Sequence, residues 1–406
     1  MKKLYLFALL LSCSASQAVA QTLKIHSGAI TTAVAASEAG EMLYSADGTA
    51  LTIMGRTYSV SEIDSITVDR STVAPSTVAV NYQGASARVL VAADVAPQLS
   101  ISVSGADVVV YADAALATEV SYALSGASSD GSFFMEGEYK STLVLDNLTL
   151  SNTRGAAIDI ANGKRLSVVI PDGTQTTLSD GVGGTHKACF FVNGHPEFEG
   201  GGTLQLVGNS KHAFASDEYT ELKKDFGKII VTKAVTDGMH IEQYFHMKGG
   251  EINISGTGGD CIDISVTKDP ADEFNGQVLI EGGSITMDVA AEDVKGLKSD
   301  DIISISGGSI KATVSGNGTK GISSGTDLFI TQPTATATLI DMTVTGTTYM
   351  PDDPELESKC RGIKVKGDFT FDGGTIRIAA TGKKSKAISV DGVYTYKSGS
   401  INCAVD

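Results

Sequence analysis

Residues 282–310 read GGSITMDVAAEDVKGLKSDDIISISGGSI, and this stretch decides the fold because it begins and ends on the same motif. Gly282 and Gly307 each start a Gly-Gly-x-Ile sequence, so one repeating unit is 25 residues long. A repeat of this length is typical of proteins built from stacked supersecondary units. Working outward, intact copies, one of them with Leu in place of Ile, start at Gly201, Gly249 and Gly373, and degenerate copies start at Phe226, Ala337 and Ser398.

Each unit contains two further elements that keep step with the glycine pair. One is a small residue followed by an apolar residue, as in Gly296-Leu297, and the other is a strand-like run such as Ile302–Ile305. Three short alternating segments cannot bury their apolar faces alone, so successive units must stack. We therefore expect an all-β fold, a right-handed single-stranded parallel β-helix, which is a solenoid of about 25 residues and three strands per coil.

The N-terminus predicts export. Residues 1–20 contain two lysines, an apolar stretch and a small-residue cleavage site at Ala18 and Ala20, which together indicate a signal peptide. An alternative is that the segment ending at Cys13 is a lipobox, which would make the protein a lipoprotein anchored through Cys13. Either way we expect a secreted, periplasmic or cell-surface protein.

The rest of the chain divides into three segments with different sequence patterns. Residues 21–75 are expected to form a small N-terminal β leader, 76–141 a cap with entry strands, and 142–406 the repeat domain. Two units exceed the period, at 266–276 and 349–359, and both are expected to project as loops. Such loops either wall a binding groove or are passive insertions.

Composition excludes several classes of protein. The 406 residues contain 31 Lys and Arg against 47 Asp and Glu, a net charge of −16, which argues against a nucleic-acid partner. After the first 20 residues no apolar run is long enough to predict a transmembrane segment. The chain has no Trp, so flat indole platforms for crystalline glycans are absent.

Several short motifs within residues 76–406 resemble those of a known family: Tyr122-Ala123-Leu124-Ser125-Gly126, Asp130-Gly131-Ser132-Phe133, Leu143–Leu150, Gly155-Ala156-Ala157-Ile158, Lys211-His212-Ala213 and Asp237-Gly238-Met239-His240. Together they resemble a family of secreted bacterial carbohydrate-binding proteins with a parallel β-helix fold similar to that of pectate lyases. The resemblance implies binding of plant-type polysaccharides, including acidic sugars and cellulose, with calcium ions on the solenoid. This chain departs from the family where basic residues replace Asp on the later repeats, so calcium is not expected there.

Outward-facing positions flank the small-apolar pair, one immediately before it and one two residues after its small member. On the later repeats these positions carry positive charges, which an anionic polymer could use; the alternative is a solvated face that keeps the sheet soluble. We call these residues the basic columns and predict that they bind substrate: Lys295, Lys298, Lys320, Arg361, Lys364 and Lys386.

The middle repeats carry acidic residues at and near the same positions. Carboxylate oxygens are the ligands that calcium prefers, so we predict a possible calcium site there; alternatively the aspartates cap backbone amides in turns. The candidate metal ligands are Asp237, Glu242, Asp260 and Asp263.

These patterns favour a non-catalytic protein that binds an acidic, polygalacturonate-like glycan such as pectin, with possible help from calcium. One alternative is a calcium-dependent polysaccharide lyase acting on uronates, since Asp260, Asp263, Lys295 and Lys298 lie on consecutive units. Its base would be a neutral lysine, which needs a strongly lowered pKa. The other alternative is a surface adhesin or scaffold without a glycan ligand. No catalytic residue is predicted, and the oligomeric state is open.

The four cysteines after the signal peptide are expected to be unpaired. Cys189 and Cys261 occupy one column but three units apart, about 14 Å at the usual strand spacing. A disulfide needs Cα atoms within roughly 7 Å. Cys360 and Cys403 belong to different elements of their units and so face different directions.

Overall fold

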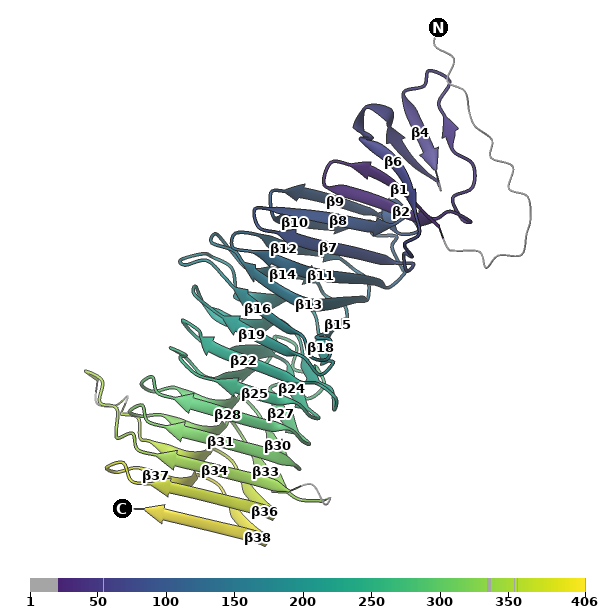
Figure 1. Ribbon diagram of the computed structural model, residues 1–406. Helices are drawn as coiled ribbons and strands as arrows, with labels where there is room; N and C mark the ends of the chain where they lie inside the picture. Colours follow the sequence, from purple (N-terminus) through teal and green to yellow (C-terminus); the bar gives the residue numbers. More distant parts are fainter. Residues whose placement is uncertain (1–20, 54, 334–336, 354, 356, 406) are drawn as a thin grey trace.

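The structure is a computed structural model that describes residues 21–53, 55–333, 337–353, 355 and 357–405. The predicted signal peptide and lipobox cysteine lie outside these residues. Figure 1 shows one long stack of strands, which runs from the N-terminal strands at one end to β38 at the other. Among the described residues, no helix is long and apolar enough to cross a membrane.

Most strands belong to two large sheets. The larger has 23 strands: β1 (Thr22–Ser27), β2 (Ile30–Ala35), β6 (Ser65–Asp69), β7 (Thr77–Gln83), β8 (Ser86–Ala92), β11 (Val120–Ser128), β13 (Ser141–Ser151), β15 (Leu166–Val169), β16 (Gln175–Ser179), β18 (Pro196–Glu199), β19 (Thr203–Val207), β21 (Thr220–Leu222), β22 (Lys228–Lys233), β24 (Tyr244–Met247), β25 (Glu251–Ile254), β27 (Gln277–Ile280), β28 (Ser284–Val289), β30 (Ile303–Ile305), β31 (Gly308–Val314), β33 (Leu328–Thr331), β34 (Thr338–Val344), β36 (Phe369–Ala380) and β38 (Tyr394–Val405).

The second sheet has 12 strands: β9 (Leu99–Ser104), β10 (Asp107–Ala112), β12 (Ser132–Gly137), β14 (Ile158–Asn162), β17 (Ala188–Val192), β20 (His212–Ser216), β23 (Met239–Glu242), β26 (Ile262–Ser265), β29 (Lys295–Ser299), β32 (Lys320–Ser324), β35 (Arg361–Val365) and β37 (Lys386–Val390). A small third sheet contains β3 (Leu43–Tyr44), β4 (Ala50–Ile53) and β5 (Arg56–Ser59), and two short 3-10 helices are η1 (Val60–Glu62) and η2 (Ala96–Gln98).

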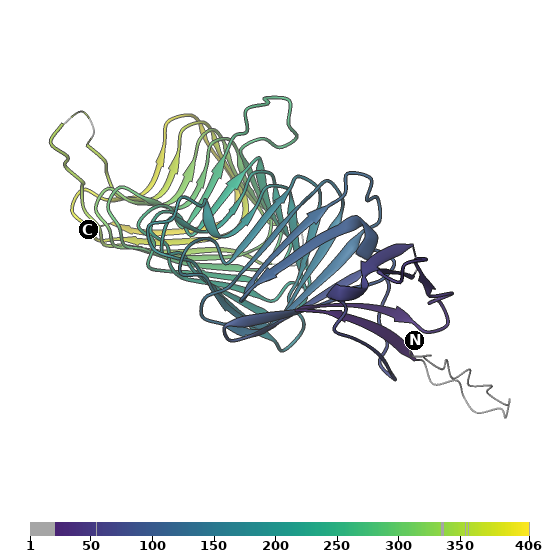
Figure 2. The same cartoon turned by 90° about the horizontal axis from the view of Figure 1, so that it is seen from above.

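From β11 onward, strands of successive repeats pair in parallel. β28 pairs with β31 and β29 with β32, so that Ile285 lies opposite Ile310 and Lys295 opposite Lys320. Equivalent residues of neighbouring units therefore form columns along the stack, as the repeat predicted. Figure 2 shows these strands one behind another, with two loops projecting from the stack.

The structure corrects the predicted parallel β-helix. The all-β class is right, but the strands form two large sheets, and both include antiparallel pairs, such as β1–β2 and β7–β8 in the larger sheet and β9–β10 in the second. Two of the three segments expected per unit also join the same sheet, because β36 runs through the aromatic run at Phe369–Phe371 and the following glycine pair without a break. Gly373 and Gly374, with φ of +114° and +89°, let the backbone bend there without leaving the sheet.

The repeat motif needs glycine for two physical reasons. Gly283 and Gly308, the second glycines of their pairs, have φ of +82° and +83°, which side chains disfavour. A Cβ atom on Gly308 would also lie 2.6 Å from the carbonyl oxygen of Gly283, and one on Gly283 would lie 2.5 Å from that of Gly250. The glycine pairs therefore pack backbone against backbone from one repeat to the next.

One continuous hydrophobic core runs between the sheets from Val78 to Ala387. In its middle the rings of Phe190, Phe198 and Phe214 meet edge to face, with centroids 5.5 to 6.3 Å apart. A smaller separate core under the N-terminal strands includes Leu23 and Tyr58.

The prediction for the cysteines is confirmed, since Cys189, Cys261, Cys360 and Cys403 are all free. The first three are buried and Cys403 is exposed. The proposed domain boundaries stay predictions.

We predict that Phe214→Ala destabilises the protein by about 3–5 kcal/mol, because it leaves a cavity where two other aromatic rings now pack. Urea unfolding followed by circular dichroism measures the effect, with Phe191→Ala as control because its ring is only half-buried in the same sheet. Equal losses in the two variants would contradict the central role given to this cluster.

Candidate functional site

The predicted site residues lie on parallel neighbours of the 12-stranded sheet. Lys295, Lys320, Arg361 and Lys386 are opposite one another in β29, β32, β35 and β37. In the second column Lys298 lies opposite Asp263. The basic columns therefore exist as the sequence predicted, and they continue directly from the acidic repeats.

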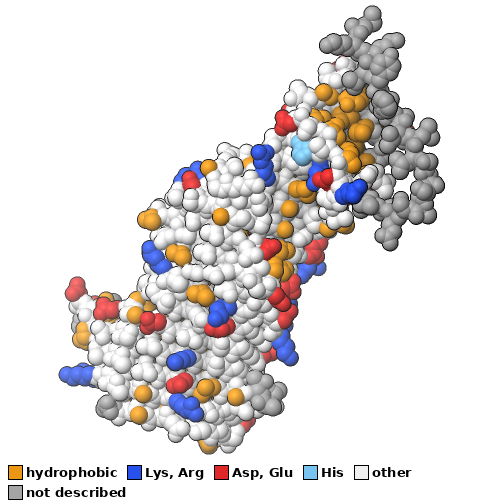
Figure 3. Space-filling model, in the orientation of Figure 1, with side chains coloured by type: hydrophobic (Ala, Val, Ile, Leu, Met, Phe, Trp, Pro, Cys, Tyr) orange, Lys and Arg blue, Asp and Glu red, His pale blue; other side chains and the backbone are white. Residues whose placement is uncertain are grey.

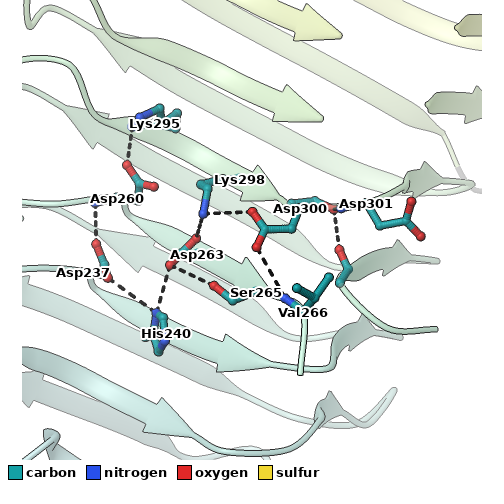
Figure 4. A network of polar contacts seen from close by, with 12 residues as sticks. Asp237, His240, Asp260, Asp263, Ser265, Val266, Lys295, Lys298, Asp300 and Asp301 are labelled. Atoms are coloured by element: carbon teal, nitrogen blue, oxygen red, sulfur yellow. Dashed lines mark hydrogen bonds and ion pairs between the residues drawn. The ribbon is translucent and has the colours of Figure 1, made fainter. Parts of the chain in front are cut away.

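Asp263 is the centre of a polar network (Figure 4). Its Oδ1 accepts a 2.6 Å bond from Lys298 Nζ, and its Oδ2 is 2.9 Å from His240 Nδ1. Lys298 Nζ is also 3.2 Å from Asp300 Oδ1. Asp263 is thus held between two cationic partners.

Asp237 lies one repeat earlier, in the same column as Asp260, and contacts two histidines. Its Oδ2 lies 3.1 Å from His212 Nδ1 and 3.6 Å from His240 Nδ1, while its Oδ1 accepts the backbone N–H of Asp260 at 2.7 Å. The two imidazole rings stack with centroids 4.6 Å apart. Asp260 repeats the backbone contact by accepting the N–H of Lys295 at 2.7 Å.

These contacts separate the protonation states of the two histidines. Burial lowers the pKa of His212 and outweighs its contact with Asp237. For His240, burial is outweighed by hydrogen bonds to Asp237 and Asp263, which raise its pKa to about 9. At neutral pH the stacked pair therefore carries one positive charge, on His240, between two carboxylates.

The carboxylates respond to the same environment. Burial opposes ionisation of Asp237 and Asp263, but hydrogen bonds from the histidines and from Lys298 hold both pKa values below their usual range. Asp260 has no such side-chain partner in the described part of the chain, and burial raises its pKa to about 6.

Three of the six residues of the basic columns pair with carboxylates of the protein itself. Lys320 Nζ lies 3.2 Å from Asp293 Oδ1, and Lys364 pairs with Asp391. Arg361 is buried and donates to the carbonyl of Cys360 at 2.6 Å. With Asp263 and Asp300 on Lys298, six basic residues face four carboxylates, which leaves a local charge of +2.

Two lysines of the basic columns have no carboxylate partner among the described residues. Within the described residues, the side chain of Lys295 bonds only the carbonyl of Asp293, at 3.1 Å. Lys386 is exposed, and among the described residues no hydrogen bond or ion pair involves its side chain. These two lysines are therefore the cations of the basic columns most available to an anion.

The arrangement of the predicted metal ligands fits calcium poorly. Glu242 lies at the far end of β23, opposite Ser265, and joins none of the contacts of Asp237, Asp260 and Asp263. The carboxylates that do lie near each other are interleaved with an imidazole and an ammonium group, whereas calcium takes six to eight oxygen ligands. Calcium binding by these residues stays a prediction.

Sequence reasoning gave no role to several residues that the structure places in polar or stacked groups. His212 and His240 are central to the network, and a second stack joins His195, Tyr219 and Tyr244. Tyr219 and Tyr244 are 25 residues apart, the length of one repeat, so the period itself could have identified this stack.

Comparisons with known proteins identify a family. A family model described as carbohydrate-binding domain-containing protein matches residues 104–405. One solved structure, of a polysaccharide lyase-like protein from C. thermocellum, has 18% identity and a TM-score of 0.48, covering 80% of this chain and 99% of that one. No curated protein matches the sequence significantly.

We predict that stability falls as pH rises from about 6.5 to 9.5. The pKa of His240 is raised to about 9 in the folded protein, so its contribution is fully present below the unfolded value and is lost as pH rises through 9. Urea unfolding should show a loss on the order of 2 kcal/mol across this window.

The stability of His240→Asn should change much less over the same pH range, because this variant lacks the charged imidazole. His26→Asn, in β1, is the matched control and should keep the full wild-type dependence. A wild-type stability that stays flat between pH 6.5 and 9.5 would contradict the charge assigned to His240.

Proposed function

This chain belongs to the family of carbohydrate-binding domain-containing proteins, and from that premise we propose that it is a non-catalytic protein that binds an acidic, polygalacturonate-like polysaccharide on its basic columns. The observation that carries the proposal is the in-register run of basic residues on β29, β32, β35 and β37. Strands in such a sheet are about 4.8 Å apart, so a polymer lying along the stack can meet several of them. The proposed ligand also suits the export predicted from residues 1–20.

The contacts of the columns support weak binding at each site. Besides the buried Arg361, only Lys295 and Lys386 of the basic columns lack a carboxylate partner among the described residues, and an exposed ion pair contributes about 0.2–1 kcal/mol. Useful affinity must then come from several contacts along one long chain. Long polymers should be retained better than short oligomers.

The ionisation of the lysines argues against a lyase. A catalytic base at this site would be a neutral lysine. Burial acts to lower the pKa of Lys298, but its contacts with Asp263 and Asp300 outweigh burial and raise that pKa above the usual value for lysine. Burial does lower the pKa of Lys320, but its ammonium group donates to the Gly318 carbonyl at 2.7 Å and faces Asp293.

We predict that the double variant Lys295→Gln/Lys386→Gln binds polygalacturonate about fivefold more weakly than wild type, because two available cations are removed. Affinity electrophoresis in gels containing the polymer measures this, and wild-type binding should weaken as salt is raised. Lys311→Gln is the matched control, since Lys311 is an exposed lysine on β31 of the other sheet. Binding that neither the double variant nor salt affects would place the glycan elsewhere.

We also predict that the wild-type protein releases no unsaturated uronide from polygalacturonate, with or without added calcium. The measurement is the ultraviolet absorbance of the unsaturated product over long incubations. Product formation that disappears in Lys298→Ala would show that the chain is a lyase and would overturn the non-catalytic assignment.

A further inference from the structure

A second surface lies on earlier repeats, beside the projecting loop 266–276 (Figure 2). It is a hollow of about 670 Å³, lined by residues 217–219, 242–244 and the loop. This volume is within the usual range of about 300–1,000 Å³ for small-ligand sites. Neither the basic columns nor the network around Asp263 contributes to it.

The loop that walls the hollow is held in place by specific contacts. Gln243 Nε2 donates to the carbonyl of Glu273 at 3.1 Å, and the carbonyl of Gln243 accepts the N–H of Gly276 at 2.5 Å. Within the loop, Asn275 Oδ1 accepts the N–H of Thr267 at 2.8 Å. The wall is therefore tied to the sheet below it.

The lining is strongly acidic. Its carboxylates outnumber its lysines by six to two: Asp217, Glu218, Glu242, Asp269, Asp272 and Glu273 against Lys187 and Lys268. In Figure 3 both acidic and basic side chains lie along the edge of the stack near β18 and β24. An acidic glycan would be repelled here, and a cationic ligand attracted.

Some of these carboxylates already have partners and others do not. Asp217 pairs with Lys187, and Glu218 Oε2 lies 2.5 Å from His195 Nδ1. Among the described residues, no hydrogen bond or ion pair involves the side chains of Glu242 and Glu273. These two carboxylates are therefore the ones available to a ligand.

The aromatic side chains of the hollow cover one another. His195 stacks on Tyr219, and Tyr219 on Tyr244, each with centroids 4.7 Å apart, while Phe274 of the loop meets Tyr244 edge to face at 5.6 Å. The rings of Tyr219 and Tyr244 are thus not free for flat stacking of a sugar ring. Recognition in the hollow must come mainly from the charged and polar groups.

The carboxylates are also too dispersed for a single ion. In the described parts of the chain, the one group of three potential ligands whose atoms lie within 4.8 Å of one another is His212, Asp237 and His240, outside the hollow. Dispersed negative charges suit an extended ligand with more than one positive group.

We propose that the hollow binds a saccharide with free amino groups, whose ammonium groups pair with Glu242 and Glu273. The saccharide class rests on the proposed function, and the charge preference rests on the lining itself. The chain would then have two glycan surfaces of opposite charge, the basic columns for acidic sugars and the hollow for amino sugars.

The test is calorimetric titration of the full chain with a glucosamine hexamer and with its N-acetylated form, at low and high salt. We expect the wild type to bind the glucosamine hexamer, more weakly at high salt, and to bind the acetylated form at least fivefold more weakly. Glu242→Gln/Glu273→Gln should weaken glucosamine binding about three- to tenfold. Glu136→Gln, an exposed glutamate on β12 of the 12-stranded sheet, is the matched control and should bind as wild type.

Polygalacturonate retention, measured in parallel, separates this proposal from the proposed function, because the double glutamate variant should keep it. Absence of glucosamine binding, equal binding of both hexamers, or full binding by Glu242→Gln/Glu273→Gln would each overturn the assignment of the hollow. If the wild-type protein does not retain polygalacturonate, that result would instead count against the basic columns alone.

Discussion

The constraint on which the rest of this structure depends is the in-register parallel pairing of one repeat with the next. Each side chain lies beside its equivalent on the neighbouring strands, as Ile285 lies beside Ile310. Apolar equivalents then stabilise each other by burial, and glycines such as Gly283 and Gly308 allow the backbones to approach. The same pairing is unfavourable for like charges, because neighbouring strands are about 4.8 Å apart.

The contacts of the charged columns follow from this constraint. Where the charge changes sign from one repeat to the next, as between Asp263 and Lys298, neighbouring residues of the column form an ion pair with each other. Where it does not, as from Lys320 to Arg361, each residue takes its partner from outside the column: a carboxylate from the preceding repeat or a backbone carbonyl. The positive electrostatic potential of these columns in the folded protein is therefore much weaker than their sequence alone suggests.

This explains what could be predicted from the sequence. The 25-residue period, the core positions and the columns follow from spacing alone, because pairing in register keeps equivalent residues together. The union of two segments in β36 could not be predicted, since it depends on how Gly373 and Gly374 bend the backbone. The partners Asp293 and Asp391 were missed because they lie in turns, whose residues follow no strand alternation. The acidic hollow depends on the conformation of loop 266–276, which the period does not determine.

The equivalence of the repeats also bears on how such a protein changes during evolution. Since each unit pairs mainly with its two neighbours, duplication or loss of one complete unit would preserve every register and alter only the length of the columns. Insertion or deletion of a single residue within a strand would instead turn its apolar side chains outward. Whole-unit gain is thus the accessible route to longer columns.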